Sequence, residues 1–177
     1  MRTLKLSAQA AALVAVAGLL GLLVWRVTHR PAAPKIGGPA PAFSLRRIDA
    51  DGKLDLASLR GKPIVLNFWA SWCGPCKNEA KMLEQASQQY SKQGVVFVGV
   101  DYNDVTSDAR RFLSHHGVTY PSVQDGSGLV ADRYGVSAVP ETYFIDRRGR
   151  LVGTHIRGTV VNQADAFRRG VEAALQP

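Results

Sequence analysis

Apolar residues occur in short runs separated by turn-forming residues, and their spacing predicts alternating strands and helices. Ile64–Trp69 is almost continuously apolar, as in a strand covered on both faces, and Val95–Val100 has the same pattern. Residues 75–90 between them have a helix-forming composition, and Gly94 lies beyond their end. These three segments predict a strand, a connecting helix and a second strand of one sheet.

Weaker patterns complete the domain. Two antiparallel hairpins are predicted, one around the Asp51-Gly52 turn and one around residues 146–150. Taken together, the elements predict an α/β domain with a central mixed sheet flanked by helices. The remaining helices are expected at Asp108–His115, with Thr106 or Ser107 as cap and Gly117 as stop, at Leu129–Tyr134, and after a cap at Asn162, with an apolar stripe of Ala166, Phe167, Val171 and Leu175.

The N-terminal part of the chain follows a different pattern. Leu6–Trp25 contains no charged residue, and the sixteen positions from Ala10 onward carry no polar side chain. A helix needs about 20 residues to cross a bilayer core, so the run predicts one transmembrane anchor with Trp25 at the interface. A buried helix of a soluble core would show a polar face, which this run lacks.

A cleaved signal peptide is the main alternative to this anchor. Its apolar region is usually about 7–15 residues long and is followed by small residues. The run here is longer, and Arg26 and Arg30 follow it directly. The chain is therefore divided into a short tail at 1–5, an anchor or signal peptide at 6–25, an extended Pro- and Gly-rich linker at 26–42, and a globular domain at 43–177.

Charge is distributed unevenly along the chain. The formal net charge is +8, but residues 1–35 hold five of the 22 basic residues and no acid. The remaining 17 basic and 14 acidic residues are nearly balanced, so the domain is not predicted to bind nucleic acid. Basic residues lie on both sides of the predicted anchor, and charge alone does not decide its orientation.

Two cysteines stand where the first buried strand gives way to the long helix, in the sequence Trp72-Cys73-Gly74-Pro75-Cys76. Unpaired N–H groups and the positive end of the helix macrodipole favour a thiolate at Cys73. Cys76 lies on the same turn, close enough to close a disulfide with Cys73. We therefore predict that Cys73 attacks a substrate disulfide and that Cys76 resolves the mixed disulfide. No cofactor is expected beyond this redox pair.

Other uses of a Cys-x-x-Cys pair fit the sequence less well. Half of a zinc site needs two further ligands, and the chain has no second cysteine pair, so no metal is expected. A haem attachment site needs a histidine directly after the second cysteine, where Lys77 stands. A purely structural disulfide across two residues would stabilise the fold little.

Two separate motifs resemble one known family. Residues 64–76, IVLNFWASWCGPC, are similar to the active-site segment of the thioredoxin superfamily, and Tyr134–Gly153 resembles a second signature of its membrane-tethered TlpA/ResA/DsbE-type branch. Asn67 and Glu79 also match residues typical of that branch. The similarity covers residues 38–175 and implies a thioredoxin-like fold.

The resemblance also implies which residues contact a substrate. Pro140 would be a cis-proline facing the dithiol, leaving the backbone of Val139 exposed so that a substrate segment can pair with it as an added strand. The alternative for Val139-Pro140 is an ordinary turn into a strand. Trp72, Gly74 and Pro75 complete the implied substrate-binding surface, on which Trp72 shields Cys73.

Glu79, one turn beyond the dithiol, has two interpretations. It either exchanges a proton with Cys76, as a third catalytic residue, or it is a solvated residue in the first turns of a helix. Lys81 stands where the branch usually carries a proline that kinks the helix, which leaves the position of Glu79 open.

The function implied by the resemblance is that of a membrane-anchored thiol:disulfide reductase outside the cytoplasm of a bacterium. Gly-Pro between the cysteines resembles the reducing members, which implies a transmembrane electron donor of the CcdA or DsbD type. Pro140–Thr142 is most similar to the cytochrome c maturation members, which reduce the cysteine pair of apocytochrome c. The alternatives are a general TlpA-like reductase for other exported proteins and a non-catalytic binding module, with a peroxidase the weakest.

Overall fold

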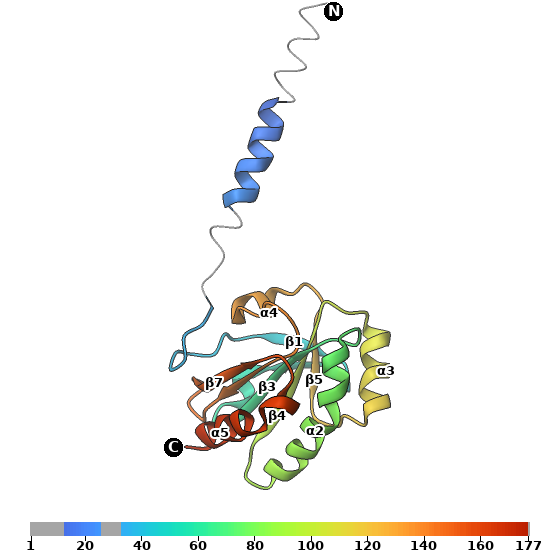
Figure 1. Ribbon diagram of the computed structural model, residues 1–177, viewed down its shortest axis with the longest axis vertical. Coiled ribbons are helices and arrows are strands. Elements are labelled where there is room, and N and C mark those ends of the chain that lie inside the picture. The colour runs from blue at the N-terminus through green and yellow to red at the C-terminus, as the bar shows by residue number, and fades with distance from the viewer. Residues whose placement is uncertain (1–12, 26–32, 177) are drawn as a thin grey trace, which may run out of the picture. The chain divides into compact units, whose positions relative to one another are not determined.

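The structure, a computed structural model, describes residues 13–25 and 33–176 (Figure 1). The chain divides into two compact units, 1–32 and 33–177. Residues 13–25 are helical. Within the described ranges, no helix has both the length and the apolar character of a membrane span. The predicted anchor and linker lie partly outside these ranges and stay predictions.

The second unit contains seven strands and six helical segments. The strands are β1 (Ser44–Arg47), β2 (Lys53–Asp55), β3 (Ile64–Trp69), β4 (Val96–Tyr102), β5 (Ser122–Asp125), β6 (Glu141–Ile145) and β7 (Leu151–Arg157). The α-helices are α2 (Gly74–Ser91), α3 (Thr106–His116), α4 (Leu129–Tyr134) and α5 (Ala164–Leu175), and the short 3-10 helices are η1 (Leu56–Leu59) and η2 (Val160–Gln163).

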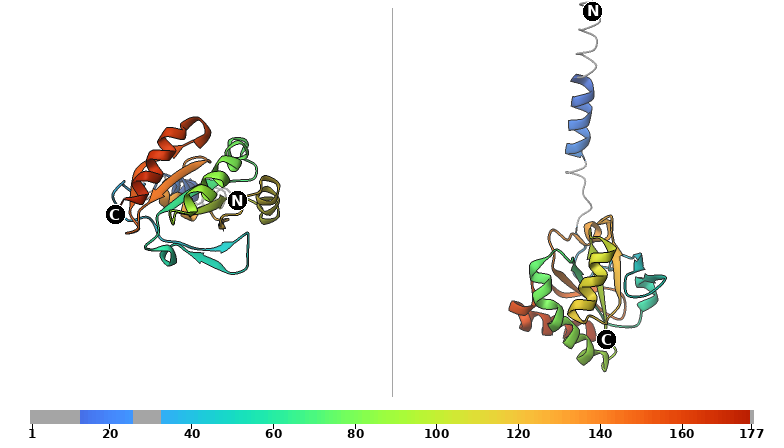
Figure 2. Two further views of the ribbon diagram at one scale, coloured as in Figure 1. Left: turned by 90° about the horizontal axis from the view of Figure 1, so that it is seen from below. Right: turned by 90° about the vertical axis from the view of Figure 1, so that its right-hand side faces the viewer.

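The strands form one mixed sheet in the order β2-β1-β5-β4-β3-β6-β7. β3, β4 and β5 are parallel, and β6 pairs antiparallel with β3. Helix α2 connects β3 to β4, and α3 connects β4 to β5, so the chain moves across the sheet in the same direction in both connections. Because such crossovers are right-handed, both helices lie on the same face of the sheet. Figures 1 and 2 show α2 and α3 side by side on this part of the domain.

Alternate residues of the central strands pack on opposite faces of the sheet, as the strand period requires. Leu66 and Phe68 of β3 pack with Tyr134 of α4 in one cluster. Val65 lies in a second cluster with Phe167 of α5. The central sheet is therefore buried on both faces, as the predicted thioredoxin-like α/β architecture requires.

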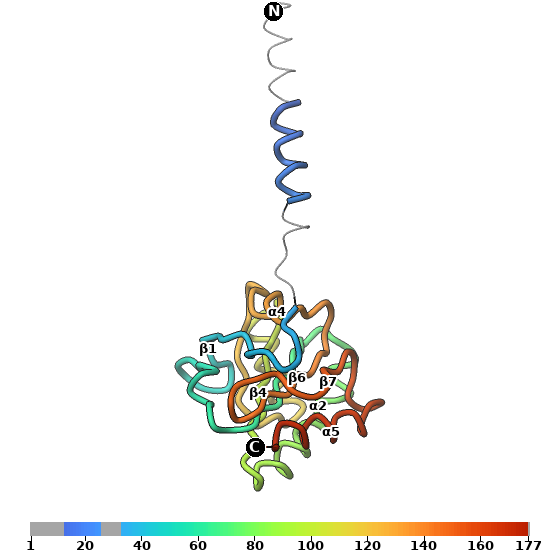
Figure 3. The backbone as a smooth tube through the Cα atoms, turned by 90° about the vertical axis from the view of Figure 1, so that its left-hand side faces the viewer, coloured from blue at the N-terminus to red at the C-terminus, as the bar shows by residue number. Residues whose placement is uncertain are grey.

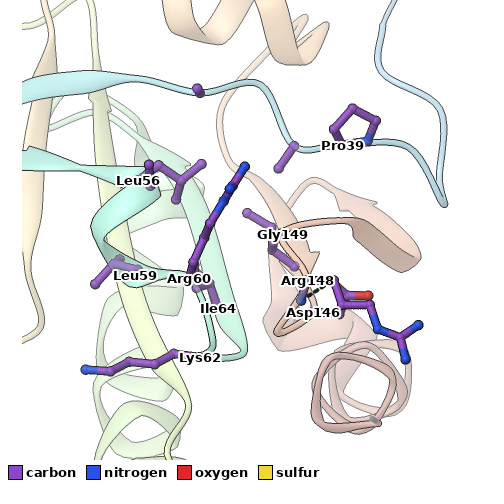
Figure 4. A pocket seen from close by; sticks show the side chains of 13 residues that line it. Pro39, Leu56, Leu59, Arg60, Lys62, Ile64, Asp146, Arg148 and Gly149 are labelled. Carbon is purple, nitrogen blue, oxygen red and sulfur yellow. Dashed lines mark hydrogen bonds between the residues drawn. The ribbon is translucent and has the colours of Figure 1, made fainter.

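The segment before β1 is joined to the far edge of the sheet. Gly37 N–H donates to the Leu151 carbonyl at 2.6 Å, and Ala40 N–H donates to the Gly149 carbonyl at 2.9 Å. Figure 3 shows residues 36–42 running beside β6 and β7. A pocket beneath this segment is lined by Leu56 and Ile64, among others, and Arg60 extends into it (Figure 4).

Most of the predicted elements are confirmed, but two predicted helix caps are wrong. α3 begins at Thr106 with Val105 as its N-cap and no side-chain cap, because the Thr106 hydroxyl donates instead to Gln124 at 2.7 Å. Asn162 lies within η2, so α5 begins after it, with Gln163 as its N-cap. The short strand β5, with its mixed composition, was not predicted.

Helix α5 packs tightly against β6 at Gly170, and this contact gives a stability prediction. A Cβ placed on Gly170 would lie 2.2 Å from Cε2 of the buried Phe144. We therefore expect Gly170→Ala to lower the free energy of unfolding by about 1–3 kcal/mol, despite the better helix propensity of alanine.

Urea denaturation would measure this loss. Gly126→Ala is the matched control, because a Cβ there meets nothing within 4 Å. It should leave stability unchanged or slightly raised. Equal stability of wild type and Gly170→Ala would show that α5 is not held against Phe144 as described.

Candidate active site

A disulfide at the start of α2 forms the centre of the site. Cys73 is the N-cap of α2, Cys76 lies in its first turn, and their sulfurs are bonded at 2.03 Å. The N–H of Cys76 donates to Sγ of Cys73 at 3.1 Å, so the orphan amide of the helix terminus points at that sulfur. Cys73 is 4% exposed and Cys76 1%, which makes Cys73 the more accessible sulfur.

The loop before β6 lies against this sulfur. The Val139–Pro140 peptide bond is cis, and the Val139 carbonyl oxygen lies 3.6 Å from Sγ of Cys73. Val139 is half-buried, while Pro140 is buried. The geometry is the one that the family resemblance implied, and it brings together two segments that are far apart in the chain.

The outer edge of the site carries an exposed aromatic residue. Trp72 is 58% exposed, and its indole N–H donates to the Asn103 carbonyl at 3.4 Å. Gly74 and Pro75 are also exposed. Trp69, by contrast, is buried and stacks on Phe112 at 4.5 Å between ring centroids. Three of the predicted substrate-binding residues, Trp72, Gly74 and Pro75, are therefore at the surface beside Cys73, whereas Val139 is half-buried and Pro140 is buried.

A turn after β4, which sequence reasoning missed, supports the loop that carries Trp72. Asp104 Oδ2 accepts a hydrogen bond from Ser71 N–H at 2.6 Å, and its Oδ1 accepts one from Val105 N–H at 2.7 Å. Asn103 holds the turn in the left-handed region at φ 47°. Only tertiary structure reveals these contacts, since an Asn-Asp pair after a strand is an ordinary turn signal.

Glu79 is buried beneath the dithiol, so its interpretation as a solvated residue is wrong. It is 1% exposed, because its position on α2 faces β3. Its Oε1 accepts from Asn67 Nδ2 at 3.0 Å, and its Oε2 accepts from Val160 N–H at 2.8 Å. Burial raises the pKa of Glu79, and these hydrogen bonds offset the rise only in part.

Asn67 connects this carboxyl to the strand that follows the cis-proline. Its side-chain NH₂ group also donates to Thr142 Oγ1 at 3.1 Å, and Asn67 and Thr142 are paired in register between β3 and β6. An amide side chain can donate twice in this way, which a carboxylate in the same place cannot. Asn67 therefore links the Glu79 carboxyl group of α2 to Thr142 of β6.

A second buried carboxyl, Glu141, lies directly after the cis-proline and was not predicted as a site residue. Its Oε1 accepts from the N–H and hydroxyl of Ser137 at 3.1 and 3.3 Å, which closes the loop containing the cis-proline. His155, stacked on Tyr143, places its Nε2 3.7 Å from Oε2. Glu141 therefore positions the loop that lies against Cys73.

A third buried acid lies at the end of β4. Within residues 33–176, neither carboxyl oxygen of Asp101 has a hydrogen-bond partner of ordinary geometry, although the side chains of Asp104 and Gln124 lie beside it. Asp101 is fully buried opposite Trp69 in the β3–β4 register. Burial, together with the negative charge of Asp104, raises the pKa of Asp101 to about 8.

No cluster of His, Cys, Asp and Glu side chains suited to a metal ion occurs among the residues that the structure describes. The chemistry that the site supports is thiol–disulfide exchange by the two sulfurs at the helix terminus.

Known proteins are similar to this chain in sequence and in fold. The model of the AhpC/TSA family matches residues 36–154. The thiol-disulfide oxidoreductase ResA of Oceanobacillus iheyensis is 31% identical over 142 residues, which cover 78% of this chain and 74% of that protein. The thiol:disulfide interchange protein DsbE of Yersinia pestis is 42% identical over 123 residues, covering 68% of this chain and 63% of that protein.

A solved structure supports the same assignment. The crystal structure of a putative thiol:disulfide interchange protein DsbE from Chlorobium tepidum has a TM-score of 0.75 and 30% identity, and the match covers 81% of this chain and 100% of that one. Family match, sequence identity and fold thus agree with the cysteine pair at the helix terminus. The chain belongs to the AhpC/TSA family, as a thiol-disulfide oxidoreductase of the ResA/DsbE type.

Proposed function

We propose that this oxidoreductase works as a reductase of polypeptide disulfides outside the bacterial cytoplasm, held at the membrane by the segment Leu6–Trp25. The observation that carries the proposal is the contact of Cys73 Sγ with both a helix-terminal N–H and the carbonyl of Val139. A nucleophilic sulfur beside a free backbone acceptor suits a disulfide in an extended peptide.

The first step uses Cys73. In the reduced protein its thiolate attacks one sulfur of the substrate disulfide, the substrate S–S bond breaks, and the departing substrate thiolate takes up a proton. The N–H of Cys76, 3.1 Å from Sγ in the oxidised state, stabilises negative charge on Cys73. The substrate backbone pairs with Val139 beside Trp72 and Pro75.

The second step uses Cys76 and Glu79. The Cys76 thiol must lose its proton before it can attack Sγ of Cys73, release the second substrate thiol and close the Cys73–Cys76 disulfide. Glu79 lies one turn further along α2 and is buried with it, and we assign it as the acceptor of that proton. Two electrons pass to the substrate, and a membrane donor of the CcdA or DsbD type returns the dithiol to its reduced form.

The division of roles between the sulfurs gives a first prediction. In Cys76→Ser the mixed disulfide formed by Cys73 cannot be resolved, so adducts should accumulate. Cys73→Ser is the matched control and should trap none. Non-reducing gels of the full chain in native membranes would count the adducts, and equal amounts from both variants would contradict the assignment.

The raised pKa of Glu79 gives a second prediction. Below that pKa the carboxyl is protonated and cannot accept the Cys76 proton, so the reductase rate of the wild type should fall as the pH drops through it. Glu79→Gln should lower the rate above that pKa by about 100-fold and lose this pH step. Stopped-flow measurement of oxidation of the reduced protein across the acidic-to-neutral range checks both effects.

Glu84→Gln is the matched control for this experiment. Glu84 is a second buried acid of α2, 7% exposed, but its carboxylate accepts from Thr119 rather than lying near the dithiol. Its variant should keep the pH step of the wild type. A Glu79→Gln variant with an unaltered pH profile would remove Glu79 from the reaction.

The substrate is proposed to be the cysteine pair of apocytochrome c, since Pro140–Thr142 most resembles the cytochrome c maturation members. Haem is attached to a Cys-x-x-Cys-His segment, whose thiols must be reduced first. A host strain carrying Cys73→Ser/Cys76→Ser in place of the wild-type chain should lose most covalently bound haem on stained gels and regain it when an external dithiol is supplied. Normal cytochrome levels without the dithiol would leave only the more general reductase.

A further inference from the structure

The solvent face of α2 beside the dithiol is cationic because the acids of this helix point inward. Glu79 is 1% exposed and Glu84 7%, and both accept hydrogen bonds within the domain. Lys77 and Lys81, on the other hand, are exposed. The solvent-exposed face of α2 is therefore positively charged, although the sequence of the helix contains both acidic and basic residues.

The neighbouring helix α3 continues this cationic face. It contacts α2 and lies beside it in Figures 1 and 2. Arg110 and Arg111 are exposed, and His115 and His116 follow in the last turn. Asp108 is the one acid of α3 in the described chain, and it forms an ion pair with Arg111.

A surface groove lies between the start of α2 and helix α3. Its lining includes Ser71, Lys77, the ion pair of Asp108 and Arg111, and the two histidines His115 and His116. Lys77 directly follows the resolving cysteine, and Ser71 precedes the attacking cysteine by two residues. Phe112, which also lines the groove, packs in one cluster with both cysteines.

We propose that this groove, lined by Lys77, Arg111, His115 and His116, docks an acidic segment of the polypeptide whose disulfide Cys73 attacks. The inference rests on the proposed function and adds a substrate preference to it. A chain that pairs with Val139 on one side of Cys73 would place its flanking residues over the start of α2. Carboxylates in that flank would meet Lys77 and Arg111.

Charge complementarity of this kind raises the rate of encounter and selects among partners. Burial, with His115 and Lys77 adding to the effect, lowers the pKa of His116. The lowered pKa favours the neutral form of the His116 imidazole. Its neighbours in the groove are Lys77, Asp108, Arg111 and His115, and protonation of His116 on acidification adds a positive charge beside them.

The test compares two synthetic peptides with the same Cys-Ala-Ala-Cys disulfide, flanked on one side by Glu residues or by an equal number of Gln residues. Each oxidises the full-length, reduced protein, and the measured quantity is the ratio of the two second-order rate constants. This ratio cancels any change in the intrinsic reactivity of Cys73. In wild type at low salt we expect the Glu peptide to react about tenfold faster, with the advantage lost at high salt.

Variants locate the effect. Lys77→Gln/Arg111→Gln should bring the ratio to within about twofold of unity, and Lys77→Glu/Arg111→Glu should make the Gln peptide the faster one. The control Lys53→Gln/Lys62→Gln removes the same charge from β2 and from the segment before β3, and should keep the wild-type ratio. His116→Gln should reduce the rise of the ratio on mild acidification.

The outcomes separate this inference from the proposed function. The docking site would be overturned if the wild type reduced both peptides at equal rates. It would also be overturned if the preference for the Glu peptide persisted after the loss of Lys77 and Arg111. In both cases the Gln peptide is still reduced, so the proposed function stands. Failure of the wild type to reduce either peptide would instead overturn the proposed function.

Discussion

The junction between β3 and α2 is the constraint on which the site depends. β3 is buried on both faces and ends at Trp69, and α2 starts five residues later, at Gly74, with Cys73 as its N-cap. A helix terminus has backbone N–H groups without partners, and here one of them points at a sulfur. Any shift of this junction would move Sγ of Cys73 away from the Val139 carbonyl. The other side chains of the site are arranged around this contact.

Three carboxyl groups support the segments that form the site, each with a different task; Glu79 and Glu141 are buried, and Asp104 is half-buried. Glu79 is held by Asn67 and Val160 beneath Cys76, Glu141 closes the cis-proline loop through Ser137, and Asp104 holds Ser71. Hydrogen bonds from backbone and side-chain donors are what make it feasible to bury such groups. The acids of the site are thereby kept off its surface.

This inward placement of acids also shapes the exterior. Removing Glu79 and Glu84 from the solvent face of α2 leaves lysines next to the redox site, and α3 adds arginines and histidines. A domain with nearly balanced charge thus has a groove with more basic than acidic side chains beside the start of α2. Interior hydrogen bonding and surface recognition are linked because the same helix supplies both.

The sequence by itself determined the redox pair, the order of most elements and the family, because these depend on local spacing: a strand pattern, a helix pattern, and Cys-x-x-Cys between them. It did not determine that Glu79 is buried, that Glu141 and Asp104 support the loops of the site, or which residues cap α3 and α5. These depend on partners far along the chain, such as Val160 for Glu79 and Gln124 for Thr106. Only the packed sheet brings such partners together, since hydrogen-bond partners and burial are properties of tertiary contacts and not of a residue's neighbours in the chain.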